Sequence, residues 1–332
     1  MFILLPYYYN IFLYCQATGG RKMQKTKELL NRNPFLYLVI GVLAMSCSGI
    51  IIKLTNAPSA IIAFYRMFIT AVILSPGFFS GNKEEKSAGT VIENKALYLF
   101  PIMTGLVNAA DYVLGTIGLK NTSIANNSII GNLSPVWVGL ATIFIFKKKL
   151  SAKYWLGMLL ALAGSMLVIG KNFYTLNFHF SIGDLCAAAS SIFYAAYFVL
   201  TEKGRKYFSA SEFFTMMLYS TCVWLFLLNI IQGNSFTNYD LQTWIYFFIS
   251  AIVCQLIGQF AISASLGFIP SEIVSITMLL HPILMTILAY PILGESVDRF
   301  QIIGGCITLA GVILVNKEKS AAENTNTEEK AG

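Results

Sequence analysis

The stretch NLSPVWVGLATIFIFKKKLSAKYWLGMLLALAGSMLV, residues 132–168, decides the fold because the chain repeats its pattern. It aligns without gaps on LLHPILMTILAYPILGESVDRFQIIGGCITLAGVILV, residues 279–315, at an offset of 147 residues. The aligned pairs include Pro135 with Pro282, Gly157 with Gly304, and the string LAG at 162–164 with the same string at 309–311. Apolar composition produces chance matches, but matches at proline and glycine in one register indicate an internal repeat.

Composition indicates a protein that crosses the membrane many times. Hydrophobic residues make up 56% of the 332 residues and charged residues 12%, with a mean hydropathy of +0.66, whereas soluble domains carry roughly 25% charged residues. The net charge of +7 does not indicate nucleic-acid binding, because the basic residues form short clusters between apolar runs, as in cytoplasmic membrane loops. We expect the lipid bilayer, and no nucleic acid, among its partners.

Ten apolar segments are long enough to cross a bilayer as helices. They are 35–56, 59–79, 96–118, 124–146, 153–170, 182–202, 212–232, 243–266, 271–293 and 300–316. The repeat places five segments in each half, and an odd number makes the second half enter the membrane from the opposite side. The sequence therefore predicts an all-α membrane protein with ten transmembrane helices in two inverted five-helix repeats.

Two repeats and two short ends make up the expected domain organisation. The first five-helix repeat is expected at 34–170 and the second at 182–316. Residues 1–33 are interpreted as an N-terminal appendage, with the part before Met23 either a mis-assigned start or an interfacial segment. Residues 317–332 are charged and rich in small side chains, which predicts a disordered cytoplasmic tail.

Most of the 23 Lys and Arg residues lie in segments that ten spans would place on one side of the membrane. These segments are 21–32, 83–95, 147–153, 203–206 and 317–330. The opposite side holds Lys53, Lys120, Lys171 and Arg299. The positive-inside rule therefore predicts a multi-pass protein of the inner or plasma membrane with both termini in the cytoplasm.

Nothing in the sequence indicates an enzyme. The six cysteines are scattered singly through apolar segments, and the two histidines, His179 and His281, are too far apart to suggest a metal centre. Neither a G-x-S-x-G elbow nor a P-loop is present. We predict no catalytic residues, no metal site and no cofactor.

The two halves resemble the drug/metabolite transporter superfamily, EamA type. In each half a proline-bearing span precedes a closing span that ends LAGSMLVIG or LAGVILV, and the resemblance covers about residues 34–317. It implies transport of a small organic metabolite, with export of amino acids, their derivatives or toxic organic compounds. In this family an acidic residue usually follows the proline-bearing span. Glu295 supplies it in the second half, but Lys148 stands at the equivalent place in the first, so we interpret Glu295 as structural.

Two charged residues lie well inside predicted spans. Asp111 is the only carboxylate at such a depth, where an ionised group costs roughly 2.5 to 3.5 kcal/mol. Asn108 precedes it by one helical turn and Tyr112 follows it. Arg66 is the lone cation within a span, and it can snorkel to the surface, pair with Asp111 or bind an anionic group of the substrate.

The repeat relates the polar residues of the two halves. Gln255 and Gln259 stand opposite Asn108 and Tyr112, whereas Gly258 stands opposite Asp111. We predict an asymmetric polar lining between the halves. The residues expected to line this substrate cavity are Arg66, Asn108, Asp111, Tyr112, Asn132, Ser134, Trp137, Tyr194, Gln255, Gln259 and His281.

Pro135 and Pro282 are expected to bend their helices at equivalent depths, either as packing kinks or to open the cavity. His281, next to Pro282 and opposite Ser134, is either a hydrogen-bonded interior residue or, like Asp111, a proton carrier.

These observations predict a secondary transporter that moves a small-molecule substrate by alternating access, with proton coupling through Asp111 or His281 or without ion coupling. The alternatives are an uncoupled facilitator or channel and, less favoured because the polar residues lie at mid-span, a membrane-embedded enzyme. A homodimer is compatible with the sequence.

Overall fold

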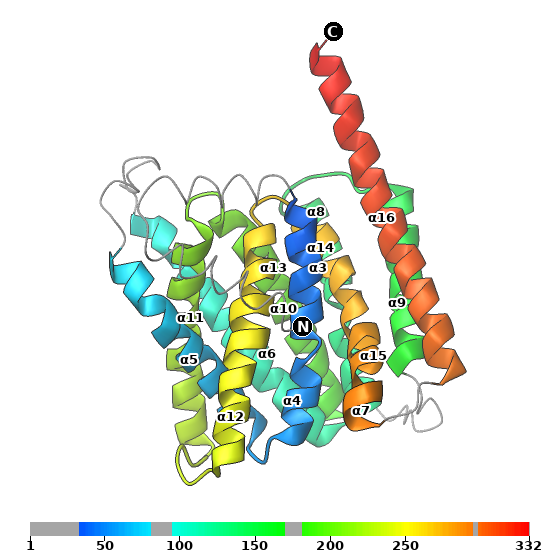
Figure 1. Ribbon diagram of the computed structural model, residues 1–332. Helices are drawn as coiled ribbons and strands as arrows, with labels where there is room; N and C mark the ends of the chain where they lie inside the picture. The colour runs from blue at the N-terminus through cyan, green and yellow to red at the C-terminus, as the bar shows by residue number, and fades with distance from the viewer. Residues whose placement is uncertain (1–32, 81–94, 170–180, 295–297, 332) are drawn as a thin grey trace. The chain divides into compact units, whose positions relative to one another are not determined.

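A computed structural model describes residues 33–80, 95–169, 181–294 and 298–331 of the chain (Figure 1). Within these ranges the regular secondary structure is entirely helical, and nine helices are long and apolar enough to cross a membrane. The prediction of an all-α membrane protein is confirmed, whereas the count of ten spans is not confirmed. The N-terminal appendage and Glu295 lie outside the described residues.

The first repeat contains α3 (Pro34–Met45), α4 (Ser48–Leu54), α5 (Ser59–Ser80), η2 (Lys95–Tyr98), α6 (Leu99–Asn121), α7 (Ile124–Gly131), α8 (Ser134–Phe144) and α9 (Ala152–Ile169). The second contains α10 (Ile182–Gly204), α11 (Ala210–Ile231), α12 (Leu241–Ile249), η4 (Ser250–Gln259), α13 (Phe260–Ser265), α14 (Ser271–Thr277), η5 (Met278–Leu280), α15 (His281–Leu293) and α16 (Arg299–Ala331). The turns of η4 are π-helical and those of η5 are 3₁₀.

Of the ten predicted spans, 124–146 is the one that does not appear among the nine long apolar helices of the described residues. It consists of two shorter helices, α7 of 8 residues and α8 of 11 residues, which meet at residues 132–133 with Pro135 in the first turn of α8. In the second repeat, η5 separates α14 from α15, with Pro282 in the first turn of α15. Proline lacks an N–H group and its ring clashes with the preceding turn, so both spans are interrupted at corresponding places.

Helix α16 continues as a helix to Ala331 (Figure 1), and the disordered tail expected at 317–332 stays a prediction. Ala, Glu and Lys, which recur in 317–331, have high helix propensity, so a helix that begins in the membrane can propagate into such a segment.

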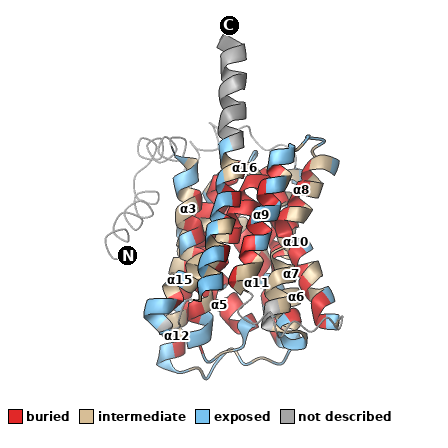
Figure 2. Ribbon diagram, turned by 90° about the vertical axis from the view of Figure 1, so that its right-hand side faces the viewer, coloured by how far each residue is buried: buried red, intermediate tan, exposed pale blue. Residues whose placement is uncertain are grey.

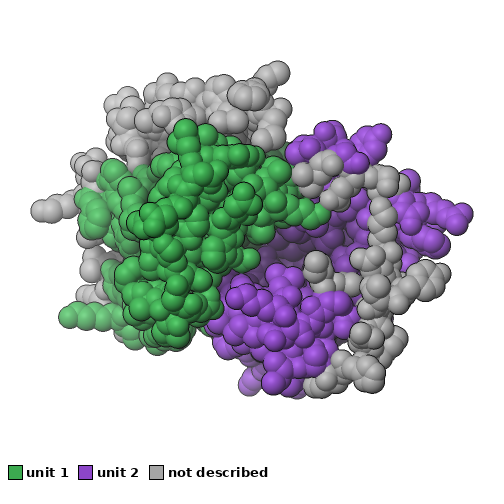
Figure 3. Space-filling view, turned by 90° about the horizontal axis from the view of Figure 1, so that it is seen from below, with its two compact units in different colours: residues 1–109, 200–269 green, residues 110–199, 270–332 purple. Residues whose placement is uncertain are grey.

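The helices group into two compact units that do not coincide with the two repeats. Unit 1 contains residues 1–109 and 200–269, and unit 2 contains residues 110–199 and 270–332 (Figure 3). Each unit therefore combines helices from both repeats, and the unit boundaries fall within α6, within α10 and between α13 and α14.

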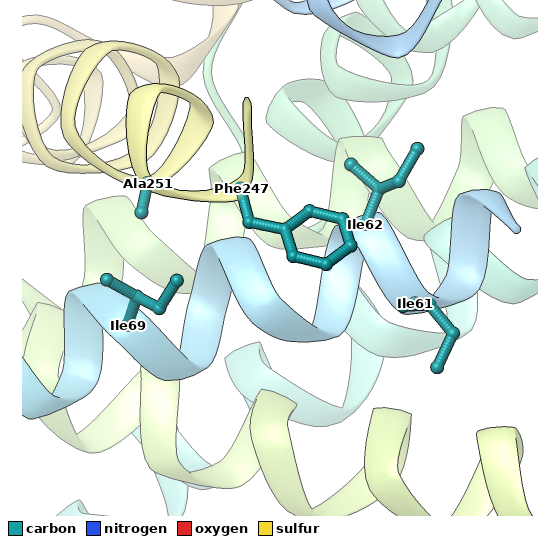
Figure 4. Close-up of a cluster of buried hydrophobic side chains, with 5 residues drawn as sticks. All are labelled: Ile61, Ile62, Ile69, Phe247 and Ala251. Atoms are coloured by element: carbon teal, nitrogen blue, oxygen red, sulfur yellow. The ribbon is translucent and has the colours of Figure 1, made fainter. Parts of the chain in front are cut away.

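Unit 1 is built around helices that the repeat relates to one another. Helix α5 packs along α11, its counterpart at the offset of 147, and α3 packs against η4 and α13. The side chains of Ile61, Ile62 and Ile69 on α5 form a buried cluster with Phe247 and Ala251 (Figure 4). Five buried side chains of this kind fix α5 against the helix that carries η4.

Unit 2 contains a close antiparallel contact between α9 and its counterpart α16. A Cβ atom on Gly164 would lie 2.5 Å from the carbonyl oxygen of Gly304, and one on Gly311 would lie 2.5 Å from that of Gly157. Only glycine allows backbones to approach this closely. Because Gly157 corresponds to Gly304 and Gly164 to Gly311, each contact joins the first glycine of one helix to the second glycine of the other.

The helices of both units carry buried residues on one side and exposed residues on the other (Figure 2). Large apolar side chains are among the exposed ones, for example Val72 at 54%, Leu159 at 60% and Ile230 at 53% exposure. Long helices whose exposed sides are apolar are suited to a hydrocarbon environment.

Candidate functional site

The residues predicted to line a cavity divide between the two units. Unit 1 contains Arg66, Asn108, Gln255 and Gln259. Unit 2 contains Asp111, Tyr112, Asn132, Ser134, Trp137, Tyr194 and His281, together with both kink prolines. Each group is described within its own unit.

Asp111 in unit 2 is held by a short hydrogen bond between helices. The hydroxyl of Ser190 on α10 donates to Asp111 Oδ1 on α6 at 2.5 Å. Gly115 lies one turn after Asp111, and a Cβ atom there would lie 3.3 Å from Ser190 Oγ. The absence of a side chain at Gly115 therefore leaves room for Ser190 beside the carboxylate, which meets the need of a carboxylate in a membrane span for a partner.

The next residue of α10 holds a second predicted site residue. The indole Nε1 of Trp137 on α8 donates to Ser191 Oγ at 2.9 Å, and Ser191 Oγ in turn donates to the carbonyl oxygen of Ala188 at 2.7 Å. The adjacent serines therefore tie α10 to Asp111 on α6 and to Trp137 on α8. Ser190 and Ser191 are not among the residues that the sequence predicted to line the cavity. Two neighbouring hydroxyls within a span were the signal for a polar role.

The other predicted residues of unit 2 have different surroundings. Asn132 Nδ2 donates to Ser165 Oγ on α9 at 3.2 Å, so this amide joins the break between α7 and α8 to the next helix. Ser134 is buried, at 4% exposure. The ring of Tyr194 stacks on Tyr197 with 6.0 Å between centroids. Tyr112 and His281 are half-buried.

Two further carboxylates, Asp184 and Glu272, lie in the first turns of their helices and are also buried in unit 2. Asp184 lies in the first turn of α10 and accepts hydrogen bonds from the backbone N–H of Ser181 at 2.9 Å and from the hydroxyl of Thr122 at 2.6 Å. This is a helix-capping arrangement, and it stabilises a negative charge at a helix N-terminus. Glu272 in the first turn of α14 accepts from the hydroxyl of Thr142 at 3.5 Å.

Asn108 in unit 1 takes part in helix packing. Its Nδ2 donates to Thr221 Oγ1 on α11 at 3.4 Å, and the hydroxyl of Thr221 lies 3.2 Å from the carbonyl oxygen of Gly105. Asn108 is 1% exposed. This amide therefore joins α6 to α11.

The remaining predicted residues of unit 1 lie on α5 and η4, and all three are buried. Arg66 on α5 is 4% exposed, while Gln255 and Gln259 on η4 are 0% and 2% exposed. In the part of the chain that the structure describes, neither Nε2 nor Oε1 of Gln255 has a hydrogen-bond partner.

Gly258 shows why the repeat counterpart of Asp111 is not acidic. A Cβ atom on Gly258 would lie 2.9 Å from Cγ of Met45 and 3.1 Å from its backbone nitrogen. Gly41 of α3 makes the reciprocal approach, because its Cβ atom would lie 3.0 Å from the carbonyl oxygen of Gly258. In unit 1 this position is therefore filled by α3, and no side chain fits.

Three comparisons place the chain among known proteins. The EamA-like transporter family matches it twice, at residues 33–170 and 181–317. An "Uncharacterized transporter" of Archaeoglobus fulgidus is 26% identical over 299 residues, which are 87% of this chain and 99% of that protein. The "Uncharacterized transporter YxxF" of Bacillus subtilis is 23% identical over 295 residues, 88% of this chain and 92% of that protein.

A solved structure described as "Crystal structure of protein" has the same fold. Its TM-score is 0.71 at 16% sequence identity, and the match covers 86% of this chain and 97% of that one. The likeness extends over both repeats and concerns the fold alone.

Proposed function

The chain belongs to the EamA-like transporter family, and from this premise we propose that it exports a small organic metabolite by alternating access. Amino acids, their derivatives and toxic organic compounds are the solute classes considered, and the inner or plasma membrane is the proposed location. The chain is a membrane transporter, as its relatives are named. The direction of transport, the identity of the solute and the coupling to protons are proposals.

The observation that carries alternating access is the reciprocal contact of α9 with α16. Gly157 meets Gly311 and Gly164 meets Gly304, which is the pattern of two helices related by a two-fold axis. Inverted repeats let one fold adopt two states that are related by exchanging the conformations of its halves, and such repeats recur in secondary transporters. This supports a carrier more than a channel.

Proton coupling through Asp111 is the second part of the proposal. An ionised carboxylate within a membrane span costs roughly 2.5 to 3.5 kcal/mol, and such residues commonly form proton relays. Ser190 contacts one oxygen of Asp111 through a hydroxyl that can donate to the ionised carboxylate and accept from the protonated one. The pair therefore suits a group that changes its protonation during a cycle. His281 is the second proposed proton carrier.

Counterflow into proteoliposomes tests this function. Purified protein should exchange labelled solutes from a panel of amino acids, sugars, nucleotides and organic acids, with saturation and with a dependence on the pH gradient. Asp111→Asn should abolish the pH dependence and lower the rate at least tenfold, while Asp298→Asn, a change near the start of α16, serves as the matched control. Flux that does not saturate would indicate a channel, and transport by Asp111→Asn with normal pH dependence would remove this residue from the mechanism.

The proposed orientation has its own test. Single cysteines in the loop after α8, at residues 147–151, and in the loop after α15, at residues 294–298, should react with a membrane-impermeant thiol reagent from opposite sides. The background has the native cysteines replaced, and the first loop should react from the cytoplasm, where both termini are proposed to lie. Labelling of both loops from the same side would contradict the inverted repeat.

A further inference from the structure

Lys147, in the loop after α8, occupies a turn position that suits glycine. Its backbone is left-handed, with a φ of 54°, which is uncommon for residues that carry a side chain. At the offset of 147 residues its counterpart is Gly294, whose φ is 67°. Both repeats therefore make the same left-handed turn, but only the second makes it with the residue that adopts it freely. A lysine at this position indicates a use for its side chain.

The loop between α8 and α9 is also strongly basic. Residues 147–149 are all lysine, whereas the equivalent residues 294–296 are Gly, Glu and Ser. Lys153 follows in the first turn of α9, where the hydroxyl of Ser151 accepts a hydrogen bond from the backbone N–H of Tyr154 at 3.1 Å. All four lysines are exposed. Among the residues that the structure describes, no carboxylate forms an ion pair with any of them.

Exposed apolar side chains lie directly before these lysines. Phe144 at the end of α8 is 74% exposed, and Ile145 is 56% exposed. The Nζ atom of Lys148 lies 5.5 Å from the centre of the Phe146 ring. Aromatic and aliphatic groups beside the ammonium groups of lysine are typical of the boundary between hydrocarbon and headgroups.

An exposed apolar stripe continues from Lys153 along α9. Leu156, Leu160 and Ala163 are exposed and follow Lys153 by 3, 7 and 10 residues, so the four side chains share one face of the helix. Ten residues of α-helix extend about 15 Å, which is about half of the roughly 30 Å hydrocarbon thickness of a bilayer. The stripe therefore matches the depth of one leaflet, with positive charge at its headgroup end.

We propose that the loop 147–153 and this face of α9 bind an anionic phospholipid such as phosphatidylglycerol. The phosphate lies among the lysines, and an acyl chain lies along the stripe of α9. Clustered lysines at a membrane surface attract anionic lipids, whereas the zwitterionic phosphatidylethanolamine brings no net charge. The equivalent loop of the second repeat carries no lysine, so the lipid binds to one leaflet only. This site is independent of the solute that is transported.

Retention of defined lipids tests the proposal. Purified protein in detergent is mixed with equal amounts of phosphatidylglycerol and phosphatidylethanolamine that have the same acyl chains, and bound lipids are counted by native mass spectrometry. Phosphatidylglycerol should be retained about tenfold better, and added salt should weaken the preference. Glycerophosphoglycerol, the headgroup without acyl chains, should not displace it. Equal retention of the two lipids would overturn the proposal, and displacement by glycerophosphoglycerol would overturn the lipid in favour of a free phosphate ester.

Matched triple variants locate the site. The variant Lys148→Gln, Lys149→Gln and Lys153→Gln should lose the preference for phosphatidylglycerol. The control removes the same number of positive charges from exposed positions outside the loop. Its changes are Lys53→Gln, Lys120→Gln and Arg299→Gln. A folded loop variant that keeps the preference, or a control that loses it to the same extent, would contradict the assignment to this loop.

Lys147→Gly separates lipid binding from stability. The change introduces the residue that the second repeat has at this turn, so the midpoint of thermal unfolding in detergent without added lipid should not decrease. It also removes one positive charge, which should weaken the preference for phosphatidylglycerol about fivefold. A merely structural lysine would give the opposite result, a lower midpoint with an unchanged preference, and that outcome would refute the role of Lys147.

Discussion

Asp111 and Gly258 occupy equivalent positions in the two repeats, but their surroundings differ. In unit 2, Asp111 accepts a 2.5 Å hydrogen bond from Ser190 across two helices. In unit 1, Gly258 lies against Met45 and Gly41 of α3, and a Cβ atom has no room there. Both positions therefore lie in helices that the repeat relates, but only the first repeat carries a carboxylate there. The helical framework is shared by the two repeats, whereas this polar group is not.

The largest expected effect comes from placing a carboxylate at the position of the second repeat that is equivalent to Asp111. Gly258→Asp would place a Cβ atom 2.9 Å from Met45 Cγ and a charge in a buried contact. An unpaired buried charge destabilises by about 3–5 kcal/mol, so we expect little folded protein in detergent by size-exclusion chromatography with fluorescence detection. Gln242→Asp, at an exposed position in the first turn of α12, is the control. Normal yields of Gly258→Asp would show that the closed packing in unit 1 is adjustable.

A smaller loss is expected where both repeats use glycine. Gly164→Ala would bring a Cβ atom to 2.5 Å from the carbonyl oxygen of Gly304, so α9 and α16 must separate. Forced overpacking typically costs about 1–3 kcal/mol, which should lower the midpoint of thermal unfolding. Gly131→Ala meets no atom within 4 Å and should be neutral or slightly stabilising, since alanine favours helix by about 1 kcal/mol. Equal midpoints for the two variants would contradict the close contact.

The smallest effect should separate the two serines of α10. Ser190→Ala removes the donor to Asp111, and Ser191→Ala removes the acceptor of Trp137. Each should cost about 1 kcal/mol of stability. Only Ser190→Ala should displace the pH profile of transport, because only this variant removes the hydrogen bond of Asp111. Identical displacement by both variants would mean that the profile reports general packing instead of Asp111.

The helical fold and the repeat were accessible from sequence because both depend on local pattern. The prolines and the glycines recur in register, and those residues impose backbone breaks and close contacts wherever they occur. The interruptions at 132–133 and at 278–280 follow from the same prolines. The count of ten spans is not confirmed at α7 and α8, where a polar sequence and a break divide one predicted helix into two short ones.

The partners of the polar residues were not accessible in this way. Ser190 and Asp111 are 79 residues apart in the chain, and no spacing rule relates them. The same holds for Gln255, because the π-helical turns of η4 and the burial of the amide depend on packing against α5. The sequence predicted that Asp111, Arg66 and Gln255 line the cavity, but the residues that contact them are known only from the tertiary structure. The grouping of helices from both repeats into each unit was likewise not predicted.

The glycine contact between α9 and α16 also bears on association between chains. In a dimer with a two-fold axis, residue i of one subunit meets residue j of the other, and j meets i. Gly157 with Gly311 and Gly164 with Gly304 reproduce this isologous pattern inside one polypeptide. The self-complementary surface of these helices is thus already occupied by the chain's own second half. A homodimer of this protein would have to form through other helix faces.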